Sequence, residues 1–121
     1  MEKIALVVRA DFSVERLDVS EDFLLKMQGA VDGLIQPVDF SQTLTMWVNE
    51  EGLLRDDLRM NPFASILFEE FLSSPMLIKG DVVFTGGTDD EGDTLGLSEG
   101  MIANLVSWAN SLEGAWERLA V

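Results

Sequence analysis

Hydrophobic and polar positions in the first half of the chain predict four strands. The apolar run within residues 3–9 is unbroken and rich in branched side chains, which indicates a strand buried on both faces. Residues 14–19 alternate apolar and charged side chains, as a half-exposed strand does. Residues 34–40 and 43–48 predict two more strands joined by a short hairpin turn, and Pro37 places the first of these at a sheet edge.

Two short helices are predicted from apolar side chains that are spaced three to four residues apart. The first is expected to begin at Ser20, a hydroxyl cap followed by two acidic residues, and to end at Gly33. Its apolar stripe contains Phe23, Leu24, Met27 and Val31. The second is expected to begin at Asn61, a cap followed by proline, and to stop at residues 73–75. Its expected buried face contains Phe63, Ile66, Leu67, Phe71 and Leu72.

The last third of the chain predicts one more strand and a long helix. Residues 81–85 form the strand, and a polar, acidic loop over residues 88–96 follows it. Ser98 is the expected cap of a helix over about residues 98–118, whose apolar stripe is the most regular pattern in the chain. That stripe consists of Met101, Leu105, Trp108, Leu112, Ala115 and Leu119.

Strands and helices mix without strict β-α-β alternation, which favours an α+β fold. We expect a small mixed or antiparallel sheet, two short helices and a longer C-terminal amphipathic helix. The length of 121 residues and the hydrophobic content of 47% suit a single domain over residues 1–121, with enough core to fold without disulfides.

The amino-acid composition favours binding over chemistry. The chain holds 22 acidic and 8 basic residues, for a formal charge of −14, and has no histidine, cysteine or tyrosine. It therefore lacks most side chains that activate nucleophiles or bind transition metals, and we expect a non-enzymatic protein without a cofactor. Phosphate backbones and anionic membranes repel such a surface, which disfavours direct binding to nucleic acid or membrane.

Three observations favour a cytoplasmic location. The chain has no cysteine with which to form a disulfide. Its first residues lack the basic region and long apolar stretch of a signal peptide. No apolar run approaches the ~20 residues needed to span a bilayer.

The acidic bias is steepest over residues 80–117, which hold eight carboxylates and no basic residue. Four of them form an acidic loop, Asp89, Asp90, Glu91 and Asp93. A calcium-binding EF-hand loop that began at Asp89 would need a glycine and a glutamate where the chain has Thr94 and Gly100. We therefore interpret the segment as a solvated loop without metal ligands. The two glycines at residues 86–87 are interpreted as turn residues, because the acids that follow would repel a phosphate.

Glu50 and Glu51 are the paired carboxylates that could divide acid and base roles between them. Adjacent side chains at a turn usually project apart, and no nucleophile accompanies them in the sequence. We interpret residues 49–52 as a structural turn, and hydrolysis by carboxylates alone is the least favoured function.

Three sequence features stand in a fixed order in the middle of the chain. They are a helix running into Val31-Asp32-Gly33-Leu34-Ile35, the turn Val48-Asn49-Glu50-Glu51-Gly52, and Asn61-Pro62-Phe63-Ala64 followed later by Lys79-Gly80-Asp81-Val82-Val83. Together, over residues 3–95, they resemble an uncharacterised family of bacteriophages and mobile elements, domain of unknown function 3846. The resemblance implies a compact α+β domain carried by a phage or plasmid. It leaves out the last helix and implies no activity, cofactor or catalytic residue.

The charge and the last helix favour a protein that binds a basic host protein and modulates it. In the sharpest form of this hypothesis the carboxylates imitate the phosphates of DNA and block a nucleic-acid-binding site, in an anti-defence or host-takeover role. The residues expected to contact the partner are Asp89, Asp90, Glu91, Asp93, Trp108, Leu112 and Trp116. The apolar stripe of the last helix leaves two interpretations open, packing on the sheet or contact with a partner, including a homodimer.

An alternative function is the binding of a small molecule or a cation. The ligand would occupy a pocket beneath the helices, lined by Trp47, Phe63 and Trp108. Acidic residues at the rim of such a pocket would favour a cationic ligand.

Overall fold

Five antiparallel strands form the central sheet of the protein, as described by a computed structural model for residues 2–119. The strands are β1 (Ile4–Val8), β2 (Val14–Asp18), β3 (Ile35–Ser41), β4 (Leu44–Asn49) and β5 (Val82–Thr85). Their order across the sheet is β2-β1-β5-β4-β3, so the last strand in the sequence lies at the centre and joins two hairpins. The α+β class and the antiparallel sheet are confirmed.

The buried strands owe their apolar runs to this order. β1 pairs with β2 along one edge and with β5 along the other, and a hydrophobic core covers each of its faces, so four of its five residues are buried. Val7 lies opposite Val83 in this pairing, and Leu6 lies opposite Phe84. The two edge strands are β2 and β3, which confirms the prediction that Pro37 lies at an edge. Proline is tolerated there because an edge strand has backbone positions with no ladder partner.

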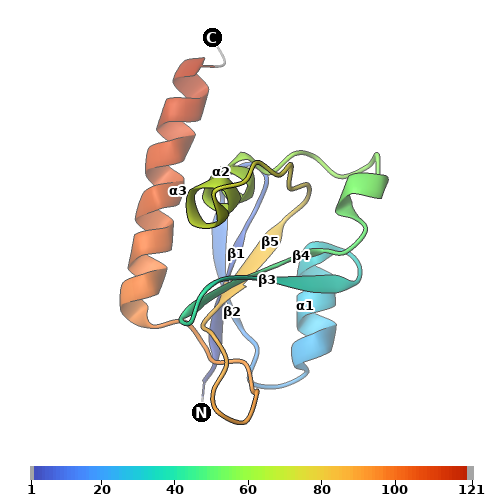
Figure 1. Cartoon of the computed structure of the whole chain (residues 1–121), viewed down its shortest axis with the longest axis vertical. Helices are drawn as coiled ribbons and strands as arrows, with labels where there is room; N and C mark the ends of the chain where they lie inside the picture. The colour runs from blue at the N-terminus through green and yellow to red at the C-terminus, as the bar shows by residue number, and fades with distance from the viewer. Residues whose placement is uncertain (1, 120–121) are drawn as a thin grey trace.

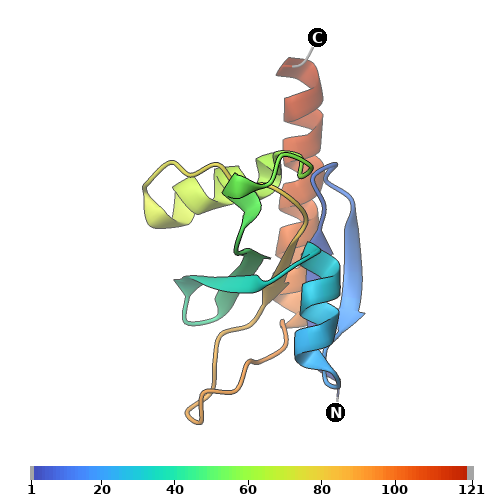
Figure 2. The ribbon, with the colours of Figure 1, turned by 90° about the vertical axis from the view of Figure 1, so that its right-hand side faces the viewer.

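Helices cover both faces of the sheet (Figure 1). On one face α1 (Phe23–Val31) packs Met27 and Val31 against alternate residues of β1 and β5. On the other face α2 (Pro62–Leu72) and α3 (Glu99–Leu119) enclose the larger core around Phe63, Phe84 and Leu105. Figures 1 and 2 show α3 as a long rod that runs past the sheet.

This two-sided arrangement contradicts the expected pocket of three aromatic residues. Trp47 packs with α1 on one face of the sheet, whereas Phe63 and Trp108 belong to the core on the other face. Successive residues of a strand point to opposite faces, and Met46 takes the position toward Phe63. Trp47 instead donates its indole N–H to the hydroxyl of Thr85, at 2.9 Å, and meets Phe23 edge to face.

The helix starts were predicted with mixed success. Asn61 caps α2 by accepting a hydrogen bond from the Ala64 N–H at 3.0 Å, and Ser98 caps α3 by accepting one from the Met101 N–H at 3.1 Å. The prediction for α1 was wrong, because that helix begins after Asp22, whose backbone is left-handed and whose side chain caps nothing. Ser20 lies outside the helix.

The buried faces of the helices are narrower than the apolar patterns suggested. Leu24 is 57% exposed, because it lies off the face of α1 that packs on the sheet, where Met27 and Val31 are the buried residues. Phe71 and Leu72 are exposed at the end of α2, which runs beyond the core. The fully buried row of α3 consists of Ile102, Leu105 and Ala109, while Leu119 is exposed at its far end. Within residues 2–119 no helix combines the length and apolar character required to cross a membrane.

Candidate functional site

Five segments that carry acidic residues meet at one end of the sheet, where the chain begins (Figures 1 and 2). The start of β1, the end of β2, the start of α1, the loop after β5 and the start of α3 meet there. Backbone hydrogen bonds tie these segments together, from Leu97 N–H to the Ile4 carbonyl and from Val19 N–H to the Lys3 carbonyl, both 2.8 Å. We call this region the acidic end; its carboxylates are Glu2, Asp18, Glu21, Asp22, Asp89, Asp90, Glu91, Asp93 and Glu99.

The predicted acidic loop is an ordered hairpin at the tip of this end. Thr88 pairs with Thr94, and the Asp89 N–H donates to the Asp93 carbonyl at 2.9 Å. The Asp89 carboxylate accepts hydrogen bonds from the N–H groups of Glu91, at 2.9 Å, and Asp93, at 3.0 Å. Asp89 therefore organises the loop, and the carboxylates of the three other acids project from it.

Two glycines fix the base of the hairpin through close packing. A Cβ on Gly87 would lie 1.9 Å from the Gln42 carbonyl oxygen, and one on Gly86 would lie 2.5 Å from that of Gly96. Only hydrogen fits at these positions. Both glycines are buried: Gly87 holds the loop against the turn between β3 and β4, and Gly86 lets the two arms of the loop lie close together, so both do more than allow a turn.

Ion pairing at the acidic end is sparse. Arg16 binds Glu99 through two hydrogen bonds of 2.9 Å, which lower the pKa of the Glu99 carboxyl below its ordinary value. Hydrogen bonds from Ser20 likewise lower the pKa of Asp18. Glu99 is the one carboxylate of the acidic end that an ion pair engages within residues 2–119. In the same part of the chain no three acidic side chains are placed to share a metal ion.

The structure separates the acidic loop from the aromatic residues of α3. Trp108 and Leu112 are half-buried against the core, and Trp116 is 39% exposed farther along the helix. At about 1.5 Å of rise per residue, Trp116 stands roughly 25 Å along the axis from Glu99. Figure 1 shows the loop at the foot of the molecule and α3 rising away from it. The seven predicted contact residues thus form two surfaces, and their role in partner binding stays a prediction.

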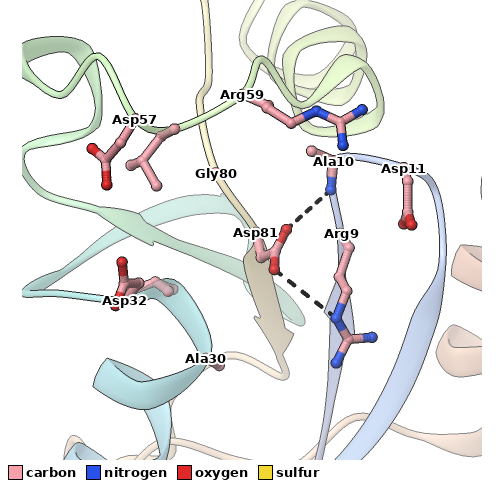
Figure 3. A pocket seen from close by; sticks show the side chains of 11 residues that line it. Arg9, Ala10, Asp11, Ala30, Asp32, Asp57, Arg59, Gly80 and Asp81 are labelled. Carbon is pink, nitrogen blue, oxygen red and sulfur yellow. Dashed lines mark hydrogen bonds and ion pairs between the residues drawn. The ribbon is translucent and has the colours of Figure 1, made fainter.

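A charged pocket of about 370 Å³ lies at the opposite end of the sheet (Figure 3). Four loops form it, namely those after β1 and α1 and those before α2 and β5. Its charged lining residues are Arg9, Asp11, Asp32, Asp57, Arg59 and Asp81. None of these six residues was predicted from the sequence to be a site residue.

Most carboxylates of the charged pocket already hold a partner. Asp81 accepts a hydrogen bond from the Ala10 N–H at 3.1 Å, and its other oxygen lies 3.9 Å from the Arg9 guanidinium. Arg55, which lies behind the lining, bridges Asp32 at 2.8 Å and Asp57 at 2.9 Å. The guanidinium lowers the pKa of Asp57, so this carboxylate stays ionised. The lining is thus a fixed network of charges.

Two buried asparagines hold the loops of the charged pocket in place. Asn49 donates to the Val31 carbonyl at 3.0 Å and to that of Asp32 at 3.2 Å. Asn61 donates to the carbonyls of Val8, at 3.1 Å, and Gly80, at 2.9 Å. Both were interpreted from sequence as local turn and cap residues, and the cap at Asn61 is confirmed. Their amides also join loops that are distant in sequence. The motifs at residues 31–35 and 79–83 supply lining residues of the pocket, and Asn49 and Asn61 hold those two segments by hydrogen bonds without lining it.

Comparison with known proteins identifies the family. A family model described as Domain of unknown function (DUF3846) matches residues 1–109. The match extends through the first half of α3, so the earlier limit at residue 95 was too short. No curated protein and no solved structure matches the chain. Because the matched range covers most of the chain, the protein belongs to the DUF3846 family, a family of unknown function.

Proposed function

We propose that the protein binds and modulates a basic partner protein through its acidic end, without catalysing a reaction. Its setting would be the cytoplasm of a host cell, with the chain encoded by a phage or mobile element. The observation that carries the proposal is the set of nine carboxylates at one end of the sheet, of which Glu99 alone is engaged by an ion pair in the described residues.

Eight of the nine carboxylates at the acidic end have no ion-pair partner within residues 2–119, so they outnumber the nearby Lys3, Arg16 and Lys26 and leave a net negative field available to a partner. Each exposed ion pair with a partner contributes little, about 0.2–1 kcal/mol, so affinity would come from the number of pairs. The same field accelerates encounter with a basic surface and makes association sensitive to salt. Binding through an ordered loop also costs less conformational entropy than binding through a flexible loop, because the backbone is already fixed.

DNA mimicry is the finer form of the proposal. A domain of this size spans about one turn of duplex DNA, and one turn carries roughly 20 phosphates. The formal charge of this protein is −14 and is spread over its whole surface. Nine carboxylates at the acidic end can imitate only part of the phosphate charge. We therefore expect the protein to cover only part of a partner's nucleic-acid-binding surface.

The test neutralises the projecting acids of the loop and spares Asp89, which organises its backbone. The variant is Asp90→Asn, Glu91→Gln and Asp93→Asn. A matched control removes three charges elsewhere, with Asp56→Asn, Glu70→Gln and Glu117→Gln. Immobilised wild-type protein and control should capture the same basic host proteins from lysate at low salt and release them at high salt. The loop variant should capture far less. Equal capture by the loop variant would refute the proposal.

A second candidate function is the binding of a small cationic molecule in the charged pocket. The observation that favours it is the pocket itself, to which the motifs at residues 31–35 and 79–83 supply lining residues while two buried asparagines hold its loops by hydrogen bonds. A thermal-shift screen with polyamines and guanidinium compounds tests this function. A ligand should raise the melting temperature of wild-type protein but not of Asp81→Asn, and a flat response across the screen would remove the candidate.

A further inference from the structure

An apolar groove opens on the α2 side of the sheet, beside the edge strand β3. It has a volume of about 280 Å³ and shares no lining residue with the charged pocket. Its floor is formed by Val38, Val48, Phe68 and Ile78. These residues come from two strands, from α2 and from the segment before β5, so the floor is part of the folded core.

The walls of the apolar groove carry large apolar side chains that face solvent. Leu53 is 60% exposed and Leu54 is 84% exposed, on a short 3-10 helix (Gly52–Leu54) that the sequence analysis missed. Met76 and Leu77 are also exposed, on the segment between α2 and β5. Contiguous exposed apolar side chains around a hollow are uncommon in a monomer and mark contact surfaces.

Hydrogen bonds fix the backbone that carries these apolar side chains, so the side chains are exposed in a defined arrangement. The Asn49 side chain accepts a hydrogen bond from the Glu51 N–H at 2.8 Å, and the Leu54 N–H donates to the Glu51 carbonyl at 3.0 Å. On the other wall the Ile78 N–H donates to the Ser65 hydroxyl at 2.9 Å. The apolar side chains therefore stand on fixed supports, as those of a docking groove do.

Two of the three charged residues that line the apolar groove and the adjoining hollow are acidic. Glu50 lines it, and Glu69 of α2 lines the hollow on the far side of Met76 and Leu77. The single basic lining residue, Lys79, turns its amino group to the Arg55 carbonyl. An occupant thus meets an apolar centre between carboxylates.

We infer that the apolar groove takes a basic amphipathic segment of the partner protein, with large apolar side chains on one face and lysine or arginine on the other. The inference rests on the proposed function in requiring a basic partner, and it adds a second point of attachment. A second copy of this chain fits less well, because it carries the same charge of −14 and would bring Glu50 and Glu69 near like charges.

The experiment uses a fluorescent helical peptide of leucine and lysine as the probe, with a leucine–glutamate peptide for comparison. Fluorescence anisotropy gives the affinity of each for the full chain at physiological salt. Wild-type protein should bind the leucine–lysine peptide only. The double variant Leu54→Ser and Leu77→Ser should bind it roughly tenfold or more weakly, because it removes two apolar anchors. The matched control Leu24→Ser and Leu25→Ser, on exposed positions of α1, should bind as the wild type does.

The possible results separate this inference from the proposed function. Unchanged affinity in the groove variant, or an equal loss in the α1 control, would overturn the inference and leave the acidic end untouched. A loss in the loop variant Asp90→Asn, Glu91→Gln and Asp93→Asn as large as that in the groove variant would also overturn it, since general charge would then explain binding. A wild-type dimer in sedimentation that the groove variant abolishes would assign the apolar groove to a second copy and refute the inference.

Discussion

Replacing Asn61 by alanine removes a side chain that performs two structural tasks at once. The side-chain oxygen caps α2 through the Ala64 N–H, and the side-chain amide donates to the carbonyls of Val8 and Gly80. The residue is fully buried, with 0% of its surface exposed. Water is therefore poorly placed to replace any of these three bonds.

The magnitude follows from the separate losses. A lost asparagine cap costs about 1 kcal/mol of stability. Each buried carbonyl left without its donor costs about 1–3 kcal/mol. We expect Asn61→Ala to lower the free energy of unfolding by about 3–7 kcal/mol, a large share of the roughly 5–15 kcal/mol of a typical domain. The melting temperature should fall by about 10–30 °C.

Urea denaturation followed by tryptophan fluorescence measures this loss. Ser98→Ala serves as the control, because it removes a helix cap at an exposed position and should cost only about 1 kcal/mol. Asn61→Asp adds a second measurement, since a carboxylate can still cap α2 but cannot donate to the two carbonyls. Burial raises the pKa of such a carboxyl, so this variant should be least stable at neutral pH and recover as acid protonates it. If Asn61→Ala lost no more stability than Ser98→Ala, the hydrogen bonds from Asn61 to the Val8 and Gly80 carbonyls would not stabilise the fold, and the reasoning would be refuted.

Two further predictions concern glycines and pH. Gly87→Ala should destabilise the protein by about 1–3 kcal/mol, because the added Cβ would clash with the Gln42 carbonyl. Gly29→Ala in α1 should stabilise it by up to about 1 kcal/mol, because the added Cβ has no neighbour within 4 Å. Melting temperatures of the two variants test both predictions. Because Arg16 lowers the pKa of Glu99, their ion pair contributes stability above the ordinary carboxyl pKa of 4.5, and the contribution is lost as pH falls through the lowered value. The gap in melting temperature between wild type and Arg16→Gln should therefore be positive at pH 7 and close in acid, and a gap that persists in acid would contradict the pairing.

Much of the fold could be predicted from the sequence, because the order of apolar and polar residues in each strand and helix reflects which residues are buried. The run in β1 is apolar throughout since strands flank it and helices cover both of its faces. The half-exposed character of β2 was also predicted, but its burial does not alternate, because Val14 packs on one core and Leu17 on the core of the opposite face. The exposed Leu24 could not be predicted. A short helix shows which residues are apolar, but the angle at which α1 meets the sheet decides which of them are buried.

The candidate sites depend on tertiary structure to a greater extent. The acidic loop was visible as a cluster, but the carboxylates of Asp18 and Asp22 join it only through the strand order. The charged pocket comes from four loops that are far apart in sequence. Asn49 and Asn61 were visible as turn and cap residues, and no local pattern states which distant carbonyls their amides reach.

The central place of β5 has a consequence for the synthesis of the protein. Each hairpin, β1–β2 and β3–β4, is complete before residue 82 is made, yet only β5 connects them. A lone hairpin is at best marginally stable in water, so the two hairpins of the nascent chain stay unpaired and poorly structured until β5 is made. Pairing β1 with β5 then closes a loop of most of the chain, a step that slows folding. The exposed apolar strands of that unpaired state are where a chaperone would engage this chain and where a truncated product would aggregate.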